Sequence, residues 1–324
     1  MKTLLLVQKS QRVILDNFYD AIARHCGDCD VRRLDEKEQR NLKAYFSRFV
    51  HAGDYDRIVL FLRFKRMMPQ VRFIRKLPNL VLLEHDAWQN FVPGKYKGAY
   101  SRFYRQLPWA RVINSGALVA SRFRREGLDA HFAPKAYDAD LLRDMGRNRN
   151  VELAFVGSSH HALYAPRREF LSALAEKENL LITRTSSGQD YCDMLNRIRF
   201  FASADVGFGE YMIKNFEAMA CGCVLFAWNQ GAVENEALGF RDMENLVLYR
   251  SLDEFRQKLA LLRSDPERAD RIARAGRVLV ENTLTWDHAG RRVCEALVPP
   301  LRQKQVFRQW GILPRYRAAP PATD

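Results

Sequence analysis

The sequence has no apolar run long enough to cross a membrane. Its longest uninterrupted apolar stretches, such as Leu4–Val7 and Leu80–Leu83, have the length of a buried strand, whereas a bilayer needs about 20 residues. Residues Met1–Val7 are followed at once by polar Gln8–Ser10, a pattern that predicts a first strand rather than a secretory signal. We therefore expect a cytoplasmic protein.

Patterns typical of metal and redox sites are also scarce. Cys26 and Cys29 have the spacing of a redox motif, but they follow a predicted helix instead of opening one, so their thiolates would lack support from a helix dipole. No second Cys or His pair completes a zinc site. Cys221 and Cys223 flank a glycine inside apolar sequence and predict small buried residues. We expect structural or incidental thiols, with the redox motif as the alternative.

Charge is distributed unevenly along the chain. Residues 1–150 hold 29 Lys+Arg and 16 Asp+Glu, a net charge of +13, whereas residues 151–290 hold 16 and 20, a net charge of −4. Residues 291–324 hold 7 and 2, a net charge of +5. This asymmetry predicts two domains with different partners.

Acidic residues are nearly absent from residues 57–125, where 15 Lys+Arg accompany only Glu84 and Asp86. Aromatic residues are interleaved with these cations. Three interpretations stay open: a solvated basic surface, attachment to an anionic membrane face or a phosphorylated lipid acceptor, and nucleic-acid binding. We rank nucleic acid last because no recognisable nucleic-acid module accompanies the charge.

Short apolar runs alternate with helical patterns along the whole chain. The strands predicted from these runs are Thr3–Gln8, Asp30–Leu34, Arg57–Leu62, Leu80–Glu84, Arg111–Asn114, Ala130–Ala133, Val151–Val156, Leu180–Thr185, Ala202–Phe208 and Asn245–Tyr249. Apolar strands that alternate with helices favour parallel sheets covered on both faces. The fold class is therefore α/β, with two Rossmann-like domains, at 1–140 and 151–290, that face each other across a cleft at the carboxyl ends of their strands.

The stretch Asp205–Trp228 is the most informative part of the chain. It predicts a strand, a glycine-bearing turn, a short helix and a second strand, with Glu210, Lys214 and Glu217 at the helix start. A helix start suits an anionic phosphate, and carboxylates beside it suit sugar or ribose hydroxyls. Such a pocket fits a nucleotide-sugar. The alternatives are a solvated loop carboxylate at Glu210 and a surface pair between Lys214 and Glu217.

A second polar cluster, Glu84-His85-Asp86, ends an apolar strand in the basic field. We predict that its side chains emerge near the cleft. There His85 or Asp86 would hydrogen-bond a hydroxyl of the acceptor or donor sugar, or act as the general base of an inverting reaction. The alternative is a strand-end cluster that is satisfied by nearby arginines.

Residues Lys214–Val224, which include Asn215, resemble the donor-site signature of GT-B glycosyltransferases. Three further stretches are similar in order and spacing to the carboxyl-terminal domain of the CgeB-like group. These are Leu153–Ser158 with Arg167-Arg168 after it, Asn245–Tyr249 with Ser251–Phe255, and Asp265–Arg268 followed by Thr285-Trp286. The resemblance covers about residues 151–290.

The resemblance implies transfer of a sugar from a nucleotide-sugar donor to an acceptor held by the first domain, with retention of configuration and without an obligatory metal. Glu217 matches the glutamate that binds ribose hydroxyls, and Glu210 corresponds to the glutamate near the donor sugar. The family usually separates this pair by seven residues, whereas this chain has six between them. The resemblance also implies that residues 291–324 form a helix and tail that return to the first domain.

The phosphate-binding Arg and Lys of the related family-4 enzymes are not evident after Gly157. Ser158, Arg167 and Lys214 are the substitutes that we expect, together with Gly157 and Asn215, to bind the donor. His160 and His161 follow the Gly157 turn, and we expect them in an exposed loop.

The function that these patterns favour is a Leloir glycosyltransferase acting on a cell-envelope glycan or lipid-linked acceptor, such as lipopolysaccharide core. The basic first half predicts a peripheral position on the inner face of the cytoplasmic membrane. The alternatives are a nucleotide-sugar epimerase of the same architecture, and a non-catalytic protein that binds membranes or nucleic acid.

Overall fold

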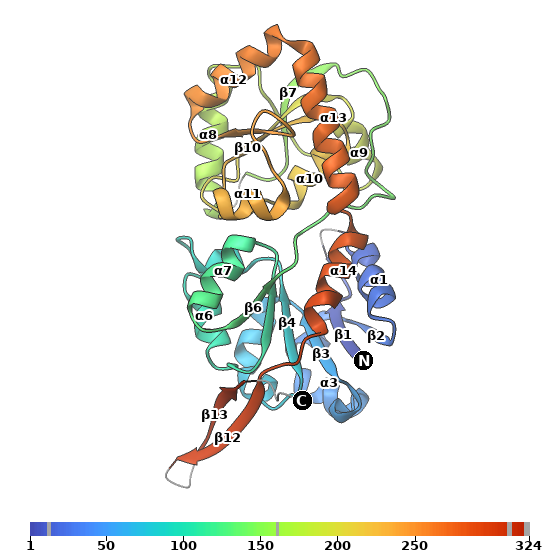
Figure 1. Ribbon diagram of the computed structural model, residues 1–324, viewed down its shortest axis with the longest axis vertical. Coiled ribbons are helices and arrows are strands. Elements are labelled where there is room, and N and C mark those ends of the chain that lie inside the picture. Colours follow the sequence, from blue (N-terminus) through green and yellow to red (C-terminus); the bar gives the residue numbers. More distant parts are fainter. Residues whose placement is uncertain (12–13, 160–161, 310–312, 321–324) are drawn as a thin grey trace. The chain divides into compact units, whose positions relative to one another are not determined.

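The computed structural model describes residues 1–324 except 12–13, 160–161, 310–312 and 321–324 (Figure 1). The chain divides into two compact units. The first comprises Met1–Pro134 with Ala289–Asp324, and the second comprises Lys135–His288. Among the helices of the described residues, none combines the length and the apolar character that crossing a bilayer requires.

The first unit is built on a six-stranded parallel sheet with strand order β2-β1-β3-β4-β5-β6. Its strands are β1 (Thr3–Gln8), β2 (Cys29–Leu34), β3 (Arg57–Phe61), β4 (Leu80–Glu84), β5 (Arg111–Asn114) and β6 (Asp129–Phe132). Leu4, Leu5 and Leu6 of β1 are fully buried, as expected for a central strand covered on both faces. The six predicted strands of this half are confirmed within one residue at each end.

Helical segments connect these strands. They are α1 (Asp16–Cys26), α2 (Glu36–Arg40), α3 (Leu42–Phe49), η1 (Ala52–Asp54), α4 (Phe64–Met67), η2 (Met68–Gln70), α5 (Val71–Ile74), η3 (Ala87–Asn90), α6 (Ala99–Tyr104) and α7 (Ala117–Arg125). The start of α2 is set by a capping box: the Asp35 side chain accepts from two backbone N–H groups, and Glu38 reaches back to the Asp35 backbone.

The second unit contains a five-stranded parallel sheet with strand order β11-β10-β9-β7-β8. Its strands are β7 (Val151–Val156), β8 (Leu181–Thr183), β9 (Ile198–Ser203), β10 (Val224–Trp228) and β11 (Val247–Tyr249). Its helical segments are η4 (Ala162–Tyr164), α8 (Ala165–Ala175), α9 (Gln189–Leu195), α10 (Ile213–Ala220), α11 (Ala232–Leu238), α12 (Leu252–Ser264) and α13 (Pro266–Thr283). The core of the sheet includes Phe200, Phe226 and Tyr249, each fully buried.

One strand prediction in this unit was wrong in position. Residues Ala202–Phe208 were expected to be a strand, but β9 starts at Ile198 and ends at Ser203. The residues that follow form a turn in which Gly207 and Gly209 adopt φ values of +76° and +73°, a left-handed conformation that favours glycine. The apolar Val206 and Phe208 belong to this turn.

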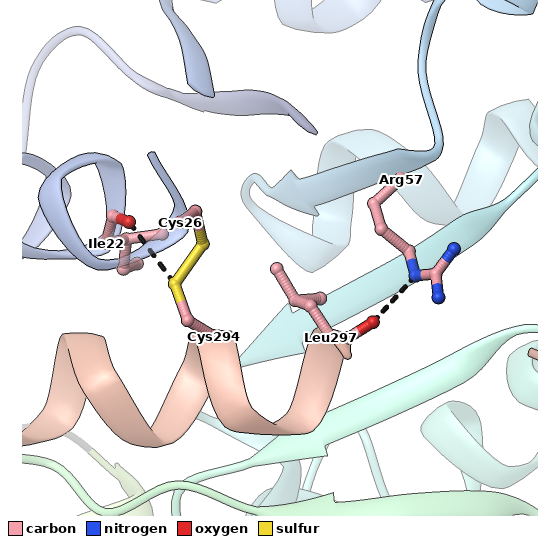
Figure 2. Close-up of a disulfide and its surroundings, with 5 residues drawn as sticks. All are labelled: Ile22, Cys26, Arg57, Cys294 and Leu297. Atoms are coloured by element: carbon pink, nitrogen blue, oxygen red, sulfur yellow. Dashed lines mark hydrogen bonds between the residues drawn. A yellow bond between two sulfur atoms is a disulfide. The ribbon is translucent and has the colours of Figure 1, made fainter. Parts of the chain in front are cut away.

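Helix α14 (Trp286–Leu297) brings the chain back to the first unit (Figure 1). Cys294 on this helix forms a disulfide with Cys26 at the end of α1 (Figure 2). The sequence analysis expected Cys26 to be a structural or incidental thiol, which is wrong: Cys26 forms a disulfide, and its partner is Cys294 rather than Cys29. Near the end of α14, Arg57 Nε donates to Leu297 O at 2.8 Å.

After α14 the chain forms an antiparallel hairpin of β12 (Gln303–Gln309) and β13 (Leu313–Ala319). The sequence analysis expected a helix and tail here and did not predict a hairpin. The hairpin belongs to the first unit and extends beyond its six-stranded sheet (Figure 1).

Candidate functional site

The strand order of the second unit defines a switch point. After β7 the chain adds β8 on one side of that strand, and it then returns to add β9, β10 and β11 on the other side. In open α/β sheets, ligands bind outside the carboxyl ends of the strands at such a point. The segments that leave β7 and β9 there are Gly157-Ser158 and Asp205–Met212, which the sequence analysis also selected.

At this switch point a lysine lies against a glycine. Gly157 has φ +153°, and a Cβ atom added to it would overlap Lys214 Nζ. The ammonium also lies 4.6 Å from the ring centroid of Phe155. A side chain at position 157 would require the end of Lys214 to move, so Gly157 and the Lys214 cation form one local arrangement.

The Lys214 ammonium has no carboxylate within ion-pair distance among the described residues. Burial, followed by the nearby Arg167 cation, lowers the pKa of Lys214 to about 8. The lysine stands on the first turn of α10, where the helix dipole and unpaired N–H groups favour an anion. The charges of Asp205 and Glu217 oppose the fall in this pKa from beyond ion-pair distance, so an anionic ligand here would add a counter-charge in direct contact with the ammonium.

Asp205 organises the turn between β9 and α10. Its buried carboxylate pairs with Arg167 Nη2 and accepts hydrogen bonds from Asn215 Nδ2 at 2.9 Å and from Met212 N at 3.4 Å. Burial alone would raise the pKa of Asp205, but Arg167, Lys214 and the Asn215 hydrogen bond together hold it below its usual value. The carboxylate is therefore ionised at neutral pH and fixes the start of α10.

Arg167 connects this turn to the loop after β7. Its side chain is 2% exposed, it donates from Nη1 to Ser158 O at 2.9 Å, and its guanidinium lies 4.2 Å from the Tyr164 ring centroid. The sequence analysis expected Arg167 and Asn215 to bind the donor. Both side chains contact buried Asp205, which holds the loop and the helix start in place, and their role toward the donor stays a prediction.

Glu210 forms a buried ion pair with Lys135, and their side chains are 1% and 5% exposed. Lys135 Nζ also lies 3.8 Å from Met212 Sδ. From the other side of the turn, Gln230 accepts from Gly209 N at 2.8 Å and donates to Asp205 O at 2.7 Å. The alternative of a solvated loop carboxylate at Glu210 is therefore wrong.

Glu217 accepts a hydrogen bond from Tyr191 Oη at 2.9 Å through its Oε2 atom. Burial raises the pKa of Glu217 to about 7, although the Tyr191 hydrogen bond and the Lys214 charge oppose that rise. No ion pair joins Glu217 to Lys214 among the described residues, so the expected alternative of a surface pair is not formed. A carboxyl group of this kind can both donate to and accept from hydroxyls.

Three contributors to this site were missed by the sequence analysis: Lys135, Tyr191 and Asp205. Asp205 had a usable signal, because a carboxylate directly after an apolar strand needs a buried partner. His160 and His161, expected in an exposed loop, lie outside the described residues. Within the described residues, no three His, Cys, Asp or Glu side chains come together as a metal site.

His85 and Asp86 belong to the first unit. His85 is 8% exposed, and its ring stacks on Phe18 and meets Phe61 edge-on, with centroids 5.5 and 4.8 Å away. Asp86 is exposed, and its backbone N–H donates to Glu84 Oε1 at 2.9 Å. Their place at the end of β4 agrees with the sequence analysis, and their role toward an acceptor stays a prediction.

Residues 125–295, more than half of the chain, match the model of the glycosyl transferase-like family. The chain belongs to this family. It is a glycosyltransferase of the GT-B type, with parallel sheets of six and five strands in its two units. No curated protein matched the chain.

Several solved structures share this fold. Sucrose-phosphate synthase from Thermosynechococcus elongatus is 12% identical, with a TM-score of 0.65 over 91% of this chain and 98% of that one. Anabaena HepE in complex with UDP is 14% identical, with a TM-score of 0.65 over 92% and 99%. A glycosyltransferase from Rickettsia africae is 12% identical, with a TM-score of 0.60 over 91% and 97%. These similarities confirm the predicted GT-B fold class.

Proposed function

We propose that this glycosyltransferase moves a sugar from a uridine-diphosphate sugar to a cell-envelope glycan or lipid-linked acceptor. The observation that carries the proposal is the Lys214 ammonium beside Gly157 at the switch point of the second unit, without a carboxylate partner among the described residues. The choice of uridine draws on Anabaena HepE, whose structures contain UDP and UDP-glucose.

In this proposal the donor diphosphate lies against Gly157 and Ser158 and the first turn of α10, with Lys214 as its cation. Glu217 binds the ribose hydroxyls through Oε1, since Tyr191 occupies its Oε2 atom. Glu210 approaches the donor sugar, with its carboxylate oriented by Lys135. The buried Asp205 network holds these groups in position before the donor binds.

The reaction breaks the bond between the anomeric carbon and the β-phosphate oxygen, and a bond to an acceptor hydroxyl oxygen forms. The hydroxyl proton passes to the surrounding water, and the nucleoside diphosphate leaves with an added negative charge. Lys214 and the start of α10 stabilise that charge as it develops. We propose retention of configuration and no obligatory metal. Because Lys214 already supplies a positive charge, treatment with a chelator should leave activity intact.

We infer the kind of acceptor from the positive charge of the first half of the chain. The first 150 residues carry 29 Lys+Arg against 16 Asp+Glu, which favours a phosphorylated or otherwise anionic acceptor at a membrane surface. Lipopolysaccharide core is one acceptor of this chemistry. His85 and Asp86 are the residues that we assign to the acceptor hydroxyl. Within the family we place the chain nearest the CgeB-like and family-4 enzymes.

The experiment is a transfer assay with radiolabelled UDP-, GDP- and ADP-sugars and a lipid-linked glycan fraction. We expect label from one UDP-sugar to enter the glycan, and Lys214→Met to reduce that transfer by about 10- to 100-fold, as expected for a lost charged hydrogen bond. Lys177→Met, at an exposed lysine of the same unit, is the matched control. Conversion of the donor into another free sugar nucleotide would instead identify an epimerase and contradict the proposal.

A further inference from the structure

The C-terminal hairpin of β12 and β13 is strongly basic. Residues 301–320 contain five Lys+Arg and no Asp or Glu. In the register of the hairpin, Lys304 lies opposite Ala318, Gln305 opposite Arg317, and Val306 opposite Tyr316. The side chains of two opposite residues point to the same face of the hairpin. Among the described residues, no third strand pairs with either β12 or β13.

The base of the hairpin is fixed to the first unit. Lys304 Nζ donates to Arg75 O and lies 4.8 Å and 5.1 Å from the ring centroids of Trp109 and Tyr316. The turn before the hairpin is held by Arg111, which donates to the carbonyls of Ala296 at 2.8 Å, Pro299 at 2.9 Å and Pro300 at 3.0 Å. These contacts give the hairpin a defined direction from the domain.

Beyond this base the hairpin presents apolar side chains next to cations. Val306 is 59% exposed. On the other face, the exposed Arg317 lies 4.6 Å from the ring centroid of Phe307. Each strand of the hairpin has one edge without a partner strand among the described residues, and an open sheet edge of this kind can accept a partner, so the hairpin is a candidate docking surface.

We propose that the β12–β13 hairpin docks the protein onto an anionic lipid surface. Besides the anchored Lys304, the hairpin contains three arginines and no acid, which complement negative headgroups at about 1 kcal/mol for each charge near such a surface. The exposed Val306 suits the boundary between headgroups and acyl chains, where apolar side chains are favoured. Nucleic acid would use the cations but leave Val306 in water, so the lipid surface fits both features.

This inference deepens the proposed function, because it names the surface that would bring the enzyme to a lipid-linked acceptor. Its test needs neither donor nor acceptor. Full-length protein is sedimented with vesicles of phosphatidylglycerol and, separately, of phosphatidylcholine. We expect binding to the first and little to the second. A uridine-diphosphate thermal shift measured on the same samples reports on the donor site independently.

The decisive variants are Arg317→Glu and Val306→Asp. Reversing one charge changes two unit charges, so Arg317→Glu should weaken vesicle binding by about 30-fold, and Val306→Asp should weaken it by about fivefold or more. The matched controls are Arg271→Glu and Val278→Asp on α13 of the second unit, whose side chains are 60% and 50% exposed. They should bind vesicles as the wild type does.

Three results would overturn the inference: equal binding to both kinds of vesicle, no binding to either, or unchanged binding by the two hairpin variants. Salt-sensitive binding to a DNA or RNA duplex without binding to vesicles would assign the hairpin to nucleic acid instead. Unchanged melting of the variants separates a lost contact from lost folding, because both substituted side chains are exposed.

Discussion

Removing the charge of Asp205 should be among the most damaging conservative changes in the second unit. Asp205→Asn leaves the Arg167 guanidinium, whose side chain is 2% exposed, without its counter-ion. Breaking a buried ion pair from one side typically costs about 3–5 kcal/mol. We therefore expect the free energy of unfolding to fall by about that amount at pH 7, with the start of α10 affected first.

The assay is a urea titration combined with hydrogen exchange of peptides from β9 and α10, which report on the second unit separately. The matched control is Glu152→Gln, which breaks a pair with Arg263 whose side chains are 48% and 34% exposed. Such a surface pair is worth about 0–1 kcal/mol. The double variant Arg167→Met with Asp205→Asn should be less destabilised than the sum of the two single variants, because no unpaired charge remains.

The pH dependence of this effect has a definite sign. The native-state pKa of Asp205 lies below its usual value of 3.8, so its contribution to stability is present above that pH and is lost as the pH falls through the native-state pKa. The difference in the free energy of unfolding between the wild type and Asp205→Asn should therefore become smaller below about pH 4. A cost of less than about 1 kcal/mol at pH 7, equal to that of the surface control, would refute this account of the turn.

Three further predictions concern other parts of the chain. The disulfide of Cys294 joins segments 268 residues apart, so reduction or Cys294→Ser should cost about 2–4 kcal/mol; unfolding that does not respond to reductant would contradict this. Gly157→Ala should displace Lys214 and weaken UDP binding about tenfold, whereas Gly127→Ala in the first unit, which also has a positive φ (+83°) and whose added Cβ meets no atom, should not. Because the pKa of Glu217 is raised to about 7, its stabilising contribution is lost as pH rises through that value, and Glu217→Gln should flatten the stability profile there.

Most strands of the fold could be predicted from local sequence patterns. Continuous apolar runs placed β1 and β4 with the bounds that the structure shows, because a central parallel strand is apolar on both faces. The β9 strand was misplaced because the apolar Val206 and Phe208 continue the pattern into a turn. The two glycines beside them were the better signal, since their positive φ marks the turn that follows the strand.

The contacts that define the site were harder to predict, because they join residues distant in sequence. Lys135 and Glu210 are 75 residues apart, and Arg167 and Asp205 are 38 apart. A sequence motif predicts that a carboxylate lies at the start of a helix. It does not predict which cation forms an ion pair with that carboxylate, because this depends on how distant segments fold together. For the same reason, the pairing of Arg167 with Asp205 was not predicted. The disulfide between Cys26 and Cys294 was also not predicted, because its two cysteines are 268 residues apart in the sequence.

The central claim is that Lys214 beside Gly157 binds the diphosphate of a uridine nucleotide. Its most direct test is calorimetric titration of UDP into the wild type, Lys214→Met and the control Lys177→Met. We expect the wild type and the control to bind alike, and Lys214→Met to bind about 10- to 100-fold more weakly while melting at a similar temperature. Equal UDP affinity in all three proteins, or no binding of UDP by the wild type, would contradict the account.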